Sequence, residues 1–179
     1  MSVHFDPNKI SFFSLDEWSV AVCAWRGCCI EVFSRAEHSV ADCILTLQGA
    51  GVAIHNDAQH QGAVARLRAL HDCMEKFSFN GHEKVARRRI ANWQRLVHQR
   101  NFLAHARIDA TQSGIVAHHY RFDGKQRGEP LPPKQLTRIE MLQLLAELED
   151  AQRALHGQLG CIKAFAPVAK PILSAQVSS

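Results

Sequence analysis

The chain has 179 residues, 46% of them apolar, which is enough to bury one core in a single domain. Its 21 Lys and Arg against 17 Asp and Glu leave a formal net charge of +4, which permits an anionic partner without demanding one. The most apolar stretch, residues 20–33, contains Arg26 and Glu31, so no membrane-spanning segment is expected. The six cysteines form no C-x-x-C pair and no signal segment opens the chain, which predicts reduced thiols in a cytoplasmic protein.

Residues 1–13 contain Pro7 and predict an irregular arm. Ser14 with Glu17 three residues later is typical of a capping box, which begins a helix. Apolar residues then recur at steps of three and four as far as Leu47, and Gly49-Ala50-Gly51 follows. We therefore predict a first, long helix at about 15–48.

Two further helices are predicted next, at about 62–77 and 82–105. The stretch from Ser78 to Gly81 separates them. One side of the later helix carries a heptad-like seam, formed by Ile90, Trp93, Val97, Arg100 and Ala104.

The next segment has the only strand-like pattern. Residues 106–111 and 115–122 flank Gln112-Ser113-Gly114 and predict a short hairpin, with all strands of the protein between 106 and 123. Thr137 and Glu140 form a second capping box, which predicts a long helix at 137–164. Residues 167–179 contain two prolines and end in small polar residues, so we expect a loose tail.

These elements predict an all-α fold, a four-helix antiparallel bundle with two long helices and a small β-hairpin insertion. Residues 14–166 would form one helical domain. The apolar faces of the helices are broad, which favours a homodimer.

The end of the third predicted helix carries the candidate chemistry. Asn101 and His105 are four residues apart, so they share a face and are able to hydrogen-bond, which would orient the imidazole. Arg100 stands on the apolar seam, where a charge is costly unless it is paired or functional. Arg100 and His105 are five residues apart, so on a helix their side chains point in directions that differ by roughly 140°. The two side chains therefore converge only at a helix end, through a long Arg reach, or from a second copy of the chain.

The run Arg100-Asn101-Phe102-Leu103-Ala104-His105, at the end of the third helix of a four-helix domain, resembles the R-x(4–6)-H motif of HEPN domains (higher eukaryotes and prokaryotes nucleotide-binding). The resemblance implies a metal-independent endoribonuclease in which two protomers share one cleft. It implies that Arg100 holds the scissile phosphate, His105 transfers protons and Asn101 orients the histidine. His98 is interpreted as a residue of the polar stripe and not as a second catalyst.

These residue types suit RNA cleavage by attack of the 2′-hydroxyl on the adjacent phosphate. A histidine transfers protons near neutral pH, and an arginine binds phosphate oxygens through its planar guanidinium. The stretch 82–107 has seven cations and one acid, so Arg87, Arg88 and Arg107 are candidate RNA-binding residues. No Glu-x-x-His pair, Gly-rich phosphate loop or Gly-x-Ser-x-Gly elbow occurs, and we expect neither a metal site nor a cofactor.

Two other functions remain open. One is a non-catalytic helical dimerisation module that binds a nucleotide, an RNA or a protein partner in the same cleft. The other is a structural dimer in which Arg100 pairs with an acid of the first helix, such as Glu37 or Asp42.

Overall fold

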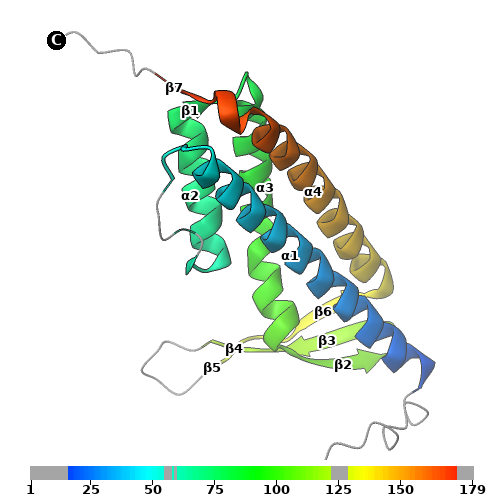
Figure 1. Cartoon of the computed structure of the whole chain (residues 1–179). Coiled ribbons are helices and arrows are strands. Elements are labelled where there is room, and N and C mark those ends of the chain that lie inside the picture. Colours follow the sequence, from blue (N-terminus) through cyan, green and yellow to red (C-terminus); the bar gives the residue numbers. More distant parts are fainter. Residues whose placement is uncertain (1–15, 55–57, 59, 122–128, 173–179) are drawn as a thin grey trace, which may run out of the picture.

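The computed structural model describes residues 16–54, 58, 60–121 and 129–172. Four helices dominate it: α1 (Glu17–Gly49), α2 (Ala63–Lys76), α3 (His82–His105) and α4 (Arg138–Phe165) (Figure 1). All four lie within two residues of the predicted ranges. The hydrophobic periodicity therefore predicted the helical part of the fold correctly.

The helix starts show which predicted caps form. The Thr137 capping box is confirmed, since Thr137 Oγ1 accepts from the Glu140 backbone N–H at 3.2 Å and Glu140 Oε2 accepts from that of Thr137 at 2.7 Å. At α1 the cap is Asp16, whose carboxylate accepts from the Ser19 N–H at 2.8 Å. The predicted cap, Ser14, lies outside the described residues.

The prediction of an antiparallel bundle is wrong for the two longest helices. α1 and α4 run in the same direction, as three contacts that advance together along both helices show: Trp25 with Met141, Ser39 with His156 and Asp42 with Lys163. α3 runs the opposite way, because Gln158 Nε2 of α4 donates to the carbonyl of His82 at 3.0 Å. α2 also runs in the direction of α1, because Lys76 at its end accepts a hydrogen bond from Ile172, which follows α4 (Figure 1).

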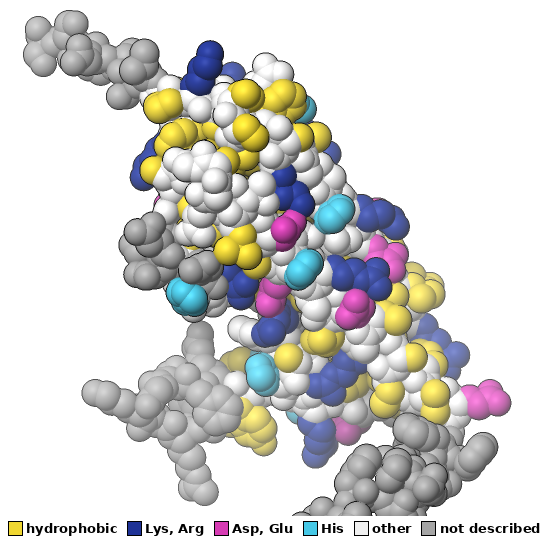
Figure 2. Space-filling view, in the orientation of Figure 1, with side chains coloured by type: hydrophobic (Ala, Val, Ile, Leu, Met, Phe, Trp, Pro, Cys, Tyr) yellow, Lys and Arg dark blue, Asp and Glu magenta, His cyan; other side chains and the backbone are white. Residues whose placement is uncertain are grey.

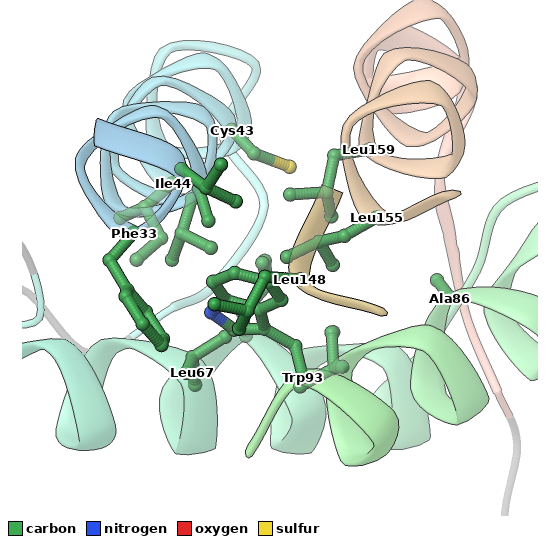
Figure 3. Packing of buried hydrophobic residues seen from close by; sticks show 14 of the residues in the cluster. Phe33, Cys43, Ile44, Leu67, Ala86, Trp93, Leu148, Leu155 and Leu159 are labelled. Carbon is green, nitrogen blue, oxygen red and sulfur yellow. The ribbon is translucent and has the colours of Figure 1, made fainter. Parts of the chain in front are cut away.

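The core lies where the four helices meet. Side chains of α1 and α4 point toward those of α2 and α3, among them Phe33, Ile44, Leu148, Leu155, Leu67 and Trp93 (Figure 3). The rings of Phe33 and Trp93 lie 5.3 Å apart, centroid to centroid. This contact fixes the middle of α3 against α1, and α3 carries the candidate site at its C-terminal end.

A small antiparallel sheet covers one end of the helices, so the fold is not purely α. The predicted hairpin is confirmed as β2 (Arg107–Thr111) and β3 (Gly114–His118). An additional strand, β6 (Lys134–Thr137), pairs with β3 and gives the order β2-β3-β6. A Cβ atom on Gly114 would lie 2.0 Å from the carbonyl oxygen of Leu136, so only glycine allows β6 to approach this closely.

The prediction that strands occur only between 106 and 123 is wrong, because β6 and three further short strands lie outside that range. β4 (Tyr120–Arg121) pairs with β5 (Glu129–Pro130), and β1 (Phe77–Ser78) pairs with β7 (Lys170–Pro171). β7 follows the short 3₁₀ turn Ala166–Val168, and the Ile172 N–H donates to the carbonyl of Lys76 at 2.7 Å. The first part of the predicted loose tail is therefore bound to the end of α2. Residues 173–179 and the predicted arm 1–13 lie outside the described residues.

All six cysteines have free thiols, and Cys29, Cys43 and Cys73 are buried. Burial raises the pKa of Cys29 and Cys43 to about 12 and that of Cys73 to about 11, so these three thiols pack as small apolar groups. Among the described helices, none is both long and apolar enough to cross a membrane.

Candidate functional site

A groove of about 840 Å³ opens beside the C-terminal end of α3. Its lining comes from α3, from the residues that follow β3, and from the first residue of β6: His98, Gln99, Asn101, Phe102, His105, His119, Tyr120 and Lys134. Two of the predicted site residues, Asn101 and His105, therefore share one surface. The groove forms because the β insertion folds back against the last two turns of α3.

Phe102 lies at the base of the groove, and two of the other lining residues contact its ring. It is 7% exposed and packs into the core. The His119 ring meets it edge-on at 5.8 Å between centroids, and Lys134 Nζ lies 4.8 Å from its centroid. Lys134 Nζ also donates to Gln99 Oε1 at 3.3 Å. The apolar ring thus places an imidazole and an ammonium group close together.

Asn101 and His105 are both exposed. The hydrogen bond predicted between them is not formed in the described structure, where neither side chain has a partner. The role of Asn101 in orienting His105 therefore stays a prediction for the substrate-bound protein.

Arg100 lies on another side of α3 and does not line this groove. Its Nε is 2.9 Å from Glu37 Oε1 on α1, with 42% of the arginine and 25% of the glutamate side chain exposed. This is one of the two pairings that the structural alternative named, whereas Asp42 pairs with Lys163. A half-exposed pair contributes only about 0–1 kcal/mol. A cleft shared by two copies would require Arg100 to leave Glu37.

Arg26 of α1 closes the end of α3. Its Nε donates to the carbonyl of Leu103 at 2.5 Å and its Nη2 to that of Ala104 at 2.9 Å. These carbonyls are among the last four of the helix, which have no partner within it and carry the negative end of its dipole. Arg26 therefore fixes the turn that precedes His105 and offsets the local negative charge.

The predicted RNA-binding arginines do not gather at the groove. Arg87 pairs with Glu75 at 2.6 Å, and Arg107 pairs with Asp109 at 2.8 Å. The Arg107 side-chain hydrogen bond is the main cause that holds the pKa of Asp109 below its usual value. Arg88 is exposed on α3 and lines none of the described cavities at this end of the molecule.

A second hollow, of about 770 Å³, continues the first between α3 and α4. The two share His98 and Gln99, and the second is also lined by two arginines and two acids, Arg89, Arg95, Glu147 and Asp150, so it carries charges of both signs. From Arg89 to His105 the lined side of α3 is about 24 Å long, at 1.5 Å per residue.

The sequence predicted two of the eight lining residues as site residues, Asn101 and His105. His98 was interpreted as a stripe residue, although its spacing from His105, two helical turns, already placed both on one face. Lys134 could be found only by knowing that β6 pairs with β3, and His119 and Tyr120 only by knowing that the chain after β3 lies against α3. No local pattern signals either contact.

One group of side chains in the described part of the chain is able to share a metal ion, formed by His71, Asp72 and Glu75 of α2. Glu75 already accepts a hydrogen bond from Arg87 at 2.6 Å. None of the three lines the groove at His105.

Comparisons with known proteins found no match to a family model, to a curated protein or to a solved structure. The case for a function therefore rests on the residues and geometry of this site.

Proposed function

We propose that the chain is a cytoplasmic, metal-independent endoribonuclease that cleaves RNA in the groove at the end of α3. The observation that carries the proposal is the meeting of His105 and Asn101 with the cation Lys134 in one open groove. A proton-transfer group and a positive charge within reach of the same phosphate are what 2′-hydroxyl attack requires.

In the proposed reaction His105 accepts the proton of the 2′-hydroxyl. The 2′ oxygen forms a bond to phosphorus while the bond from phosphorus to the 5′ oxygen breaks. The leaving 5′ oxygen takes a proton from water, which the open groove admits, and His105 returns its proton to the solvent. The products are a 2′,3′-cyclic phosphate and a 5′-hydroxyl, and no oxidant or reductant takes part.

Cleavage should proceed in EDTA, because a histidine and not a metal-bound water activates the nucleophile. The test incubates the purified full chain with a mixed set of RNAs in EDTA and in Mg²⁺, and identifies the end groups by mass spectrometry. We expect equal rates and 2′,3′-cyclic phosphate ends. Cleavage that needs Mg²⁺ and leaves 5′-phosphates would contradict the proposal.

A homodimer is part of the proposal. The start of α4 exposes Ile139 and Leu142 at 68% and 67%, and α1 exposes Val20 at 44%. Figure 2 shows hydrophobic side chains over the N-terminal half of α1 and the start of α4. An exposed apolar patch of this kind is typical of a protein contact.

Sedimentation equilibrium should give twice the 20.0 kDa chain mass at tens of micromolar. The double variant Ile139→Ser with Leu142→Ser should sediment as a monomer with unchanged helicity. Leu45→Ser, a control at an exposed position on α1, should remain dimeric. A wild-type monomer would refute the dimer, and a dimeric double variant would refute this interface.

The structural dimer is the second candidate, and the Arg100–Glu37 pair favours it, because Arg100 is engaged by an acid of α1 and not by the groove. Folded wild type that neither binds nor cleaves RNA, with Arg100→Ala mainly lowering the melting temperature, would support this alternative. Folded wild type that binds RNA in EDTA but leaves every RNA intact would instead support the non-catalytic binding module.

A further inference from the structure

The cations around the end of α3 differ in what they contact. Arg26 is bonded to two backbone carbonyls, Arg100 to Glu37 and Arg107 to Asp109. Lys134 differs from these three, since within the described residues its ammonium group contacts neither a carboxylate nor a backbone carbonyl. Its polar contact is the neutral amide of Gln99 at 3.3 Å. This is a long, uncharged hydrogen bond, which an anionic oxygen would readily replace with a stronger one.

His119, at the same end of the groove, has an unusual environment. Its Nδ1 atom is enclosed and has no hydrogen-bond partner among the described residues. An enclosed N–H without an acceptor is costly, so in the neutral ring we assign the proton to Nε2. His119 then offers one N–H donor, and its contact with Phe102 holds the ring beside Lys134.

We infer that Lys134 and His119 hold the phosphate that is cleaved, in the place where the sequence led us to expect Arg100. The inference rests on the proposed function and adds residues to it. The lysine supplies charge and up to three donors, and the imidazole supplies a directed N–H. Arg26 contributes indirectly, because it offsets the negative end of the α3 dipole where the phosphate would bind.

One chain supplies all the residues of the proposed phosphate site. Lys134, His119 and His105 belong to one chain and line one groove, so the reaction needs no residue from a second protomer. Arg100 then remains paired with Glu37 during turnover. The monomeric double variant of the α4 face should accordingly retain cleavage.

A binding experiment tests the inference without relying on turnover. Isothermal titration calorimetry with uridine 3′-monophosphate and with inorganic phosphate measures Kd for the full chain and five variants. Lys134→Gln should weaken uridine 3′-monophosphate binding by about tenfold or more, the size expected for a lost charge-assisted hydrogen bond. Lys134→Arg should stay within a few-fold of wild type. His119→Phe, which keeps the aromatic contact with Phe102, should weaken binding several-fold.

Arg100→Gln and the exposed Lys84→Gln are the controls, and both should bind like wild type. All variants are first checked for unchanged thermal melting. The inference is overturned if Arg100→Gln loses binding while Lys134→Gln keeps it, or if wild type binds neither ligand at millimolar concentration. RNA cleavage that continues at the wild-type rate in Lys134→Gln also overturns it, while the proposed function stands. If binding depends on Lys134 but no RNA is cleaved, the phosphate site is correct and the proposed function is wrong.

Discussion

Replacing His105 with alanine should lower the rate of RNA cleavage by roughly 10²- to 10⁴-fold, the usual contribution of a general acid or base. His105 is exposed in the groove, so the variant should keep its structure. RNA binding should change little, because the phosphate is held by Lys134 and His119. Single-turnover cleavage and fluorescence anisotropy with a labelled RNA measure the two effects separately.

His38→Ala is the matched control for this variant. His38 is an exposed histidine of α1 that lines a different hollow, together with Arg35 and His156. The His38→Ala variant should cleave RNA at the wild-type rate. His98→Ala is not a neutral control, because His98 lines the groove of His105. If His105→Ala cleaves RNA as fast as His38→Ala, His105 has no catalytic role.

Trp93→Ala should have the largest effect on stability, about 3–5 kcal/mol, because removing a buried Trp leaves a cavity that the helices fill only partly. Trp93 is 1% exposed and packs on Phe33. Its loss would loosen α3 against α1 and move the groove residues at the end of the helix. The free energy of unfolding, measured by urea denaturation, checks the prediction.

Leu45→Ala serves as the comparison for Trp93→Ala. Leu45 is 53% exposed on α1, so its truncation should change the free energy of unfolding by about 0.5 kcal/mol or less. Equal losses in the two variants would mean that α3 is not anchored through Trp93.

The sequence predicted the features of the fold that depend on residues near one another in the chain. Apolar spacing gave the ranges of all four helices, and the Thr137 capping box marked the start of α4. The direction of α1 relative to α4 was not predictable in this way. It depends on the direction in which α2 starts after the connection 50–62. Such a connection has no periodic pattern from which that direction could be predicted.

In the site, too, contacts within one helix could be predicted and contacts between distant segments could not. Asn101 and His105 share a face because they are four residues apart on α3, and spacing alone predicts this. Lys134 reaches the groove only through the pairing of β6 with β3, which depends on the close approach at Gly114. Arg26 caps α3 from a position 77 residues earlier in the chain. Contacts between distant segments follow from packing, and no local motif announces them.

The most direct test of RNA cleavage by 2′-hydroxyl attack is a single 2′-deoxy substitution. An RNA that wild type cuts at two mapped positions is prepared with deoxyribose 5′ to one of the two scissile phosphates. Because DNA lacks the attacking hydroxyl, cleavage at that position should stop while cleavage at the second position continues at its original rate. Continued cleavage at the substituted position would contradict the account.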